Sequence, residues 1–364
     1  MFNQCIESPN TFDNKKYQRL SVGVMRWRKR DAVTRITIQA LKELGCEVID
    51  FHFEDDLPKD LDLIFVLGPN GTLTPLVNQL LAGSNQRRPL LVIHHTEQFP
   101  NPGLPEWTRY PIALMRSRLE RMSFRQDDGG RWARKPHLSW INGKVNRFRY
   151  YGDLHWINQS GINYLISVES PWTANFLRER GLNAIATDGF WFPNHSDWGA
   201  DLSRVRDIPV LWIGKYGSTR RRALLQRLRS ELHNCGVNLL SVDGVENPFV
   251  DGNERTEILN RTKVVLNLLR QKWDNNLGRF YLAALNRAIF ISEPMFPHSQ
   301  LIVSGRHYIE APVAQLSDVI MYYVTNDPER QRITDQAYDL VTKEITTRGT
   351  LGKILDAISE QDLI

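Results

Sequence analysis

Short apolar runs alternate with amphipathic segments along most of this 364-residue chain. Near-continuous apolar strands, separated by helices with one apolar face, are typical of a parallel sheet that is buried on both faces. Gly45 follows the first amphipathic segment as a helix stop, and Ser170 can cap the helix that Pro171 begins. The first series of expected elements has strands at 20–25, 48–53, 61–67, 89–94 and 164–168, and helices at 31–44, 73–81 and 171–181.

A second series begins after a linker at 190–207 that is rich in Pro, Gly, Asn and Asp. Two series joined by a linker predict two Rossmann-like domains, with ligands bound beyond the carboxyl ends of the strands. We expect domains at 1–195 and 205–345, and a final helix at 346–364 that packs back on the first domain. The second series has strands at 209–213, 237–242, 263–268 and 288–292, and helices at 219–234, 253–261 and 277–287.

Residues 97–150 break this rhythm, because they contain five prolines and a Gly-Gly pair. The pattern predicts one helix near 110–124, flanked by long irregular stretches. Between 104 and 150, eleven Lys/Arg stand against four Asp/Glu, whereas the whole chain has a net charge of +5. This basic and aromatic insertion suits an anionic partner: a polyanionic polymer, a lipid headgroup or a nucleic acid. The alternative is a solvated, Arg-rich surface.

Composition and motif content exclude several classes of protein. Hydrophobic residues make up 41% of the chain, as in globular proteins, and the three cysteines are isolated. No segment approaches the ~20 apolar residues of a membrane span, so we expect a cytoplasmic protein, with peripheral association at the inner face of a membrane left open. The chain lacks a nucleophile elbow, a P-loop lysine motif, H-E-x-x-H and C-x-x-C. Asp60-Leu61-Asp62 lies where a strand begins, so we assign no metal site and leave metal dependence open.

The segment VLWIGKYGSTRRR at 210–222 is the first candidate ligand site. A buried strand leads into a turn with Gly214 and Gly217 and then into a helix. Backbone N–H groups and the positive end of a helix attract anions, and Ser218 is placed to cap that helix. Three consecutive arginines add positive charge, so the pattern predicts a diphosphate cradle. The alternative is a glycine-bearing loop with arginines on a solvated helix face.

The second candidate lies between residues 266 and 293. A strand, a polar loop and a helix follow one another, and Arg279 lies near the helix start, away from the apolar face. An arginine there can clamp a phosphate in bidentate fashion. We expect its replacement by alanine to weaken ligand binding with stability nearly unchanged. The alternative is a surface arginine that pairs with Asp274.

Four segments in this order give a family resemblance: VLWIGKYGSTRRRALLQRL, ILNRTKVVLNLLRQ, GRFYLAALNRAIFISE and GRHYIEAPVAQLSDVIMYYVTNDPERQRITDQA. They resemble the C-terminal domain of GT-B glycosyltransferases, most closely the CgeB-like branch of the group 1 enzymes and more distantly the phage DNA β-glucosyltransferases. The resemblance implies two facing Rossmann-like domains with a cleft between them and a nucleotide-diphosphate sugar, such as a UDP-sugar, on the second.

The resemblance also implies roles for individual residues. Gly214, Lys215 and Arg220 or Arg221 would contact the phosphates, as would Arg279. The family usually carries a ribose-binding Glu three residues after that arginine, but Leu282 stands there. Three explanations are open. Glu293 or Asp274 binds the ribose hydroxyls instead, the nucleotide is held in another way, or activity is altered or lost. The full predicted donor set is Gly214, Lys215, Ser218, Arg220, Arg221, Arg270, Arg279 and Glu293.

On the acceptor side, His94-His95-Thr96-Glu97 ends the fourth expected strand. Histidine has a pKa suited to proton transfer near neutrality, so His95 and Glu97 are the candidate catalytic pair, with a structural role as the alternative. The sequence does not rank the remaining carboxylates, Asp153, Glu169 and Asp188.

These observations predict a glycosyltransferase that moves a hexosyl or pentosyl unit from a nucleotide-diphosphate donor to an acceptor hydroxyl, with no cofactor beyond the donor. One alternative is a DNA-modifying glycosyltransferase that acts on a hydroxylated base. The other is a non-catalytic GT-B module with a lapsed donor site. The acceptor and the oligomeric state stay open.

Overall fold

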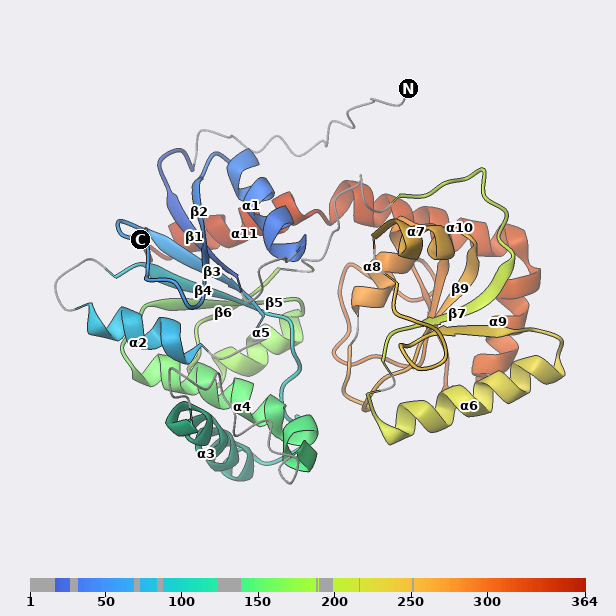
Figure 1. Ribbon diagram of the computed structural model, residues 1–364, viewed down its shortest axis with the longest axis horizontal. Helices are drawn as coiled ribbons and strands as arrows, with labels where there is room; N and C mark the ends of the chain where they lie inside the picture. The colour runs from blue at the N-terminus through green and yellow to red at the C-terminus, as the bar shows by residue number, and fades with distance from the viewer. Residues whose placement is uncertain are drawn as a thin grey trace. The chain divides into compact units, whose positions relative to one another are not determined.

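The computed structural model describes residues 17–26, 32–68, 73–83, 88–123, 139–187, 189, 199–215, 217–250, 252–275 and 277–364. The chain divides into two compact units (Figure 1). The N-terminal unit lies within Thr11–Gly189 and includes the end of the chain, Thr347–Ile364, whereas the C-terminal unit lies within Phe190–Thr346. Each unit is a parallel sheet with helices, so the predicted pair of α/β domains is confirmed.

The N-terminal sheet is parallel and its two central strands are buried at every position. Helices α1 (Ala32–Glu43) and α11 (Thr347–Glu360) cover one face (Figure 1). The Tyr17 hydroxyl donates a hydrogen bond to Asp356 of α11 over 2.6 Å. Helices α2 (Thr74–Ala82), α4 (Ser139–Gln159) and α5 (Pro171–Arg178) pack on the other face, where they form one hydrophobic core with the strands. The strand order is β2 (Glu47–His52), β1 (Ser21–Arg26), β3 (Leu63–Leu67), β4 (Leu90–His95), β5 (Tyr164–Val168) and β6 (Ala184–Ala186).

The C-terminal sheet is also parallel, and its core lies on both faces. Helices α6 (Thr219–Asn234) and α9 (Leu316–Thr325) pack on one face, and α8 (Leu277–Leu285) packs on the other. The bounds of α6 agree with the predicted helix at 219–234. Two further helices are α7 (Gly252–Asn260) and α10 (Asp327–Asp339). The strand order is β11 (Ile309–Glu310), β10 (Ile289–Ser292), β9 (Thr262–Asn267), β7 (Ile208–Ile213) and β8 (Leu239–Val242).

The basic insertion corrects one sequence prediction. A helix near 110–124 was expected between long irregular stretches, but α3 (Glu106–Ser123) begins earlier and α4 (Ser139–Gln159) forms a second long helix. The two pack together through small and polar residues. A Cβ at Gly152 would collide with the carbonyl oxygen of Ala113, and Ser117 donates to Asp153 over 2.6 Å. Hydrophobic periodicity misses α4 because the α3 contact is built from polar groups and a close backbone approach.

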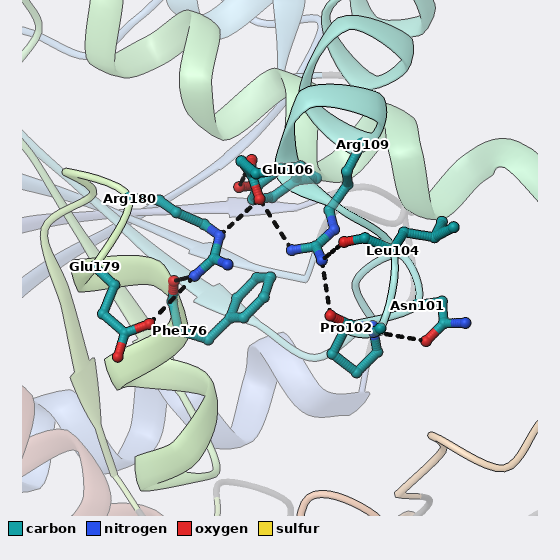
Figure 2. Close-up of polar contacts among 10 residues, drawn as sticks. Asn101, Pro102, Leu104, Glu106, Arg109, Phe176, Glu179 and Arg180 are labelled. Atoms are coloured by element: carbon teal, nitrogen blue, oxygen red, sulfur yellow. Dashed lines mark hydrogen bonds and ion pairs between the residues drawn. The ribbon is translucent and has the colours of Figure 1, made fainter.

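A buried polar cluster fixes the start of α3 (Figure 2). The Arg109 side chain is 1% exposed and donates to the carbonyl oxygens of Pro102 and Leu104. Glu106 accepts from both Arg109 and Arg180, at 3.1 and 2.8 Å. The Phe176 ring of α5 (Pro171–Arg178) lies between the two guanidinium groups, whose carbons are 4.9 and 3.8 Å from its centre. These contacts tie the loop that follows β4 to both α3 and α5.

Candidate donor site

The first candidate site is a turn between a buried strand and a capped helix. Strand β7 is followed by Gly214 with φ of 122° and Gly217 with φ of 67°, values that side chains rarely adopt. Ser218 then caps α6 by accepting a hydrogen bond of 3.2 Å from the Arg221 backbone N–H. The helix start therefore presents its positive end beside a glycine turn, which is an arrangement suited to anions.

Arg279 lies against this turn, but it is buried rather than exposed. Its Nε donates to the Ile213 carbonyl oxygen at 2.7 Å, and its Nη1 donates to Asn267 Oδ1 at 2.9 Å. A Cβ at position 214 would meet Arg279 Nη2 at 2.7 Å, so only glycine leaves room for the guanidinium. Burial lowers the pKa of Arg279 to about 9. This value is still above neutral pH, so the guanidinium is charged there. Arg279 therefore joins the ends of two strands and also brings a positive charge to the turn.

Arg221 contributes a second buried guanidinium, and part of its hydrogen-bonding capacity is unused. The side chain is 3% exposed, and its Nη1 donates to the Lys215 carbonyl oxygen at 3.1 Å. Its Nε and Nη2 have no hydrogen-bond partner among the described residues. Burial lowers the pKa of Arg221 to about 10, so this group is also charged at neutral pH. Buried N–H donors without acceptors are costly, and a bound anion would satisfy them.

Arg220 and Glu293 form a bidentate ion pair beside these groups. The two Nη atoms of Arg220 donate to the Glu293 carboxylate at 2.8 and 2.5 Å. The same carboxylate accepts from the Leu269 backbone N–H at 2.6 Å, and Arg220 also donates to the Leu269 carbonyl oxygen. Glu293 is 3% exposed. Of the predicted donor residues, these two are therefore engaged mainly with each other and with the chain after β9.

Arg270 completes the cluster. Its Nε and backbone N–H lie 3.4 and 3.1 Å from Asp274 Oδ2, and its side chain packs against Gly217 together with Arg221. Asp274 is fully buried, and its Oδ1 has no hydrogen-bond partner among the described residues. The exposed Lys215 lies 5.7 Å from the centre of the Phe249 ring. Five basic side chains thus stand against two carboxylates, and three positive charges are left unbalanced.

Leu282 stands where the family resemblance implies a ribose-binding carboxylate. It is half-buried and packs against the core of the C-terminal unit. The two proposed substitutes are both held elsewhere, because Glu293 pairs with Arg220 and Asp274 is fully buried. Sequence reasoning missed these engagements, since each joins residues that are distant along the chain or hidden in the core.

The acceptor-side residues lie in the N-terminal unit, at the carboxyl end of β4. His94 is fully buried, and its Nδ1 lies 2.9 Å from Ser167 Oγ. His95 is 4% exposed and stacks on Phe99 with ring centres 4.3 Å apart. Burial lowers the pKa of His95 to about 3, so the near-neutral pKa that suggested a proton acceptor is not retained. Glu97 follows in the next loop and is half-buried.

The structure separates the carboxylates that sequence could not rank. Asp153 is buried between α3 and α4, where burial raises its pKa to about 6. Glu169 directly follows β5, whose last residue Val168 is in register with His95, and burial raises its pKa to about 7. Asp188 lies outside the described residues. Glu169 is thus a further carboxylate at the same sheet edge as Glu97, and its position after a buried strand was the available sequence signal.

Two other expectations concern metals and membranes. Asp62, of the D-x-D sequence, accepts from the Ser21 backbone N–H at 2.9 Å at the start of β1. Within the described ranges, no group of three or more His, Cys, Asp or Glu side chains is arranged to hold a metal ion. In the same part of the chain, no helix is long and apolar enough to span a bilayer.

The comparisons with known proteins agree with this architecture. Residues 220–356 match the family model described as glycosyl transferase-like, which is less than half of the chain. No curated protein sequence matches. Similar solved structures include the Anabaena protein Alr3699/HepE in complex with UDP and glucose, with a TM-score of 0.53, 12% identity, and coverage of 94% of this chain and 100% of that chain.

Two further structures extend the comparison. Sucrose-phosphate synthase from Thermosynechococcus elongatus has a TM-score of 0.56 at 9% identity, over 94% of this chain and 100% of that chain. TarM of S. aureus has a TM-score of 0.51 at 11% identity over 81% of this chain, which spans 54% of the length of TarM. These are GT-B glycosyltransferases, so the fold defines the class: a two-domain, Rossmann-like GT-B protein with a glycosyltransferase-like domain.

Proposed function

We propose that this protein transfers a sugar from a UDP-linked donor to an acceptor hydroxyl. The fold, the glycosyl transferase-like match and the UDP-containing neighbour support the donor class. The acceptor oxygen would bond to the anomeric carbon while the bond from that carbon to the diphosphate breaks, and the hydroxyl proton would pass to a base. Positive charge near the departing diphosphate would stabilise it, which is the role that metal ions have in other enzymes.

The observation that carries this proposal is the state of Arg221. It is buried at the start of α6, it is charged at neutral pH, and two of its N–H-bearing nitrogens have no partner among the described residues. A diphosphate offers acceptors of the charge and geometry that a guanidinium binds well. Gly214, Lys215, Ser218, Arg270 and Arg279 would surround the same anion. We assign Arg220 and Glu293 the role of holding the loop after β9 in place.

We further propose that the nucleotide is held through its diphosphate and not through a ribose carboxylate. Leu282 cannot accept hydrogen bonds, and neither Glu293 nor Asp274 offers an exposed oxygen. For proton transfer, Glu97 stays a candidate, with His95 as a neutral ring that stacks on Phe99. Glu169 is the alternative base, because its raised pKa lies closer to neutrality. From the sequence resemblance, we also propose that this chain belongs near the CgeB-like branch of the group 1 glycosyltransferases.

The test is calorimetric titration with UDP, UDP-glucose and UMP. We expect UDP to bind at least about tenfold more tightly than UMP, because the second phosphate meets the arginine cluster. Arg221→Gln should weaken UDP binding by about tenfold or more, since a charged hydrogen-bond donor is lost. Arg222→Gln is the matched control, because this exposed neighbour carries the same charge on the same helix. If neither UDP nor another nucleoside diphosphate binds, the proposal is wrong.

The non-catalytic alternative keeps one observation in its favour, the missing carboxylate at Leu282. A module whose donor site has lapsed predicts no turnover, with nucleotide binding weak or lost. Incubation with radiolabelled UDP-glucose and lysate-derived acceptors, followed by measurement of released UDP, separates it from the transferase. Release of UDP that depends on Arg221 supports the transferase, whereas binding with no release under any acceptor condition supports a binding module.

A further inference from the structure

Helix α3 of the N-terminal unit carries an apolar stripe on its outer face. Four large hydrophobic residues are exposed along it: Trp107 at 79%, Met115 at 58%, Leu119 at 50% and Met122 at 68%. Pro111 and Arg118 are also exposed. At about 100° per residue, all six fall within an arc of roughly 120°, and the stripe runs for about 22 Å. Exposed apolar stripes of this kind mark interaction surfaces.

The stripe points outward because the opposite side of α3 is fixed. Ala113, Ser117 and Glu120 are buried against α4, and α3 lies on the far side of α4 from the sheet (Figure 1). The start of α3 is held by the Glu106–Arg109–Arg180 cluster (Figure 2). The helix therefore presents the apolar stripe as a preformed surface.

Charge on and around the stripe identifies the kind of partner. Arg118 lies within the arc, and it forms no hydrogen bond or ion pair among the described residues. Helix α3 itself carries four arginines and two glutamates, and each glutamate is paired with an arginine of the same helix. A helix that lies in the headgroup region of an anionic bilayer typically carries Trp, Met or Leu side chains that enter the bilayer and basic side chains beside them. A nucleic-acid surface would instead need basic side chains along the stripe.

We propose that α3 is a membrane-docking surface, which binds in the plane of a bilayer that contains anionic phospholipid. Trp107, Met115, Leu119 and Met122 would enter the boundary between headgroups and acyl chains, and Arg118 would meet the lipid phosphates. The N-terminal unit would thus be held at a membrane surface. This inference does not depend on donor binding, because α3 belongs to the other unit from the arginine cluster.

The test is co-sedimentation of the full chain with vesicles of phosphatidylcholine, with and without about 30 mol% phosphatidylglycerol. We expect clear binding to the anionic vesicles and weak binding to the neutral ones. The double variant Trp107→Glu/Met122→Glu should bind at least about tenfold more weakly, because two apolar anchors become acidic. Arg118→Gln should lower binding by about fivefold.

The matched control is Leu202→Glu/Val205→Glu, which introduces the same charge at residues 72% and 79% exposed in the C-terminal unit. It should bind vesicles like the parent. Circular dichroism melting confirms folding, and Met115→Glu/Leu119→Glu is the second variant if the first does not fold. Nucleotide titration of each variant should stay unchanged, so failure of membrane docking is distinguishable from failure of the donor site.

Several results would overturn the proposal. The first is equal binding to neutral and anionic vesicles, and the second is no binding to either. The third is vesicle binding like that of the parent by both double variants of the α3 stripe. Preference for duplex DNA over vesicles in an anisotropy assay would assign the surface to nucleic acid. Concentration-dependent dimers in sedimentation, abolished by the α3 variants and without vesicle binding, would assign it to a second copy of this chain.

Discussion

Arg279 Nε donates a hydrogen bond of 2.7 Å to the carbonyl oxygen of Ile213, the last residue of β7. The same guanidinium reaches Asn267 at the end of β9, and its carbon lies 4.4 Å from the centre of the Trp212 ring. One side chain thus links the start of α8 to the ends of two neighbouring strands. It supports the turn on which the proposed diphosphate site depends.

The first prediction concerns Arg279→Ala. The sequence alone predicts a loss of ligand binding with little change in stability, but burial and two hydrogen bonds change that expectation. We expect the free energy of unfolding to fall by about 3 kcal/mol, because two acceptors and a cavity are left behind. UDP binding should fall as well. Urea unfolding and calorimetry measure both, with Arg222→Ala as a control that changes stability by less than about 0.5 kcal/mol. An unchanged unfolding midpoint would contradict the structural role.

The second prediction concerns Gly214→Ala. A Cβ there would lie 2.7 Å from Arg279 Nη2, and the backbone φ of 122° disfavours any side chain. We expect a loss of about 2 kcal/mol or more in stability. In the Arg279→Ala background the cost should be about 1 kcal/mol smaller, because the collision is gone and only backbone strain remains. A double-mutant cycle by urea unfolding measures this coupling, and strictly additive costs would exclude it.

The third prediction concerns the ribose. If no carboxylate grips the sugar of the nucleotide, UDP and 2′-deoxy-UDP should bind with affinities within about threefold of each other. A carboxylate that accepts a ribose hydrogen bond would cost the deoxy compound about tenfold or more. Competition titration measures the ratio, and UMP against deoxy-UMP serves as the control pair. A tenfold preference for UDP would show that an acid reaches the ribose after all.

The fourth prediction concerns acid stability. Burial lowers the pKa of His95 from 6.5 to about 3, so the unfolded chain binds a proton below pH 6.5 that the folded chain does not. His95 therefore makes stability fall as pH drops from about 6.5 toward 3, and this contribution is complete above 6.5. His95→Phe keeps a ring on Phe99 without titrating, and it should reduce the slope by about 1.4 kcal/mol per pH unit. Urea unfolding of the parent and the variant between pH 4.5 and 6.5 measures this slope. An unchanged slope would mean that His95 keeps an ordinary pKa in the folded chain.

Local patterns predicted much of the fold. The alternation of apolar strands and amphipathic helices placed the strands of both sheets except the short edge strands β6 and β11, and the Ser218 cap and the two glycines marked the turn before α6. Such signals lie within a few residues of each other, so they can be read directly. Helix α4 was missed because its contact with α3 depends on Gly152, Asp153 and Arg149, which have no apolar period.

The sequence by itself determined the fold class, the glycine turn and the concentration of positive charge in 104–150 and 214–222. Only the tertiary structure decided which of these charges are engaged. Arg220 pairs with Glu293, Arg279 is buried between strand ends, and Arg221 keeps unused donors. Helix α3 likewise exposes the four large apolar residues of its outer stripe. The reason is physical: burial and pairing depend on groups that lie far apart along the chain and meet only when it folds.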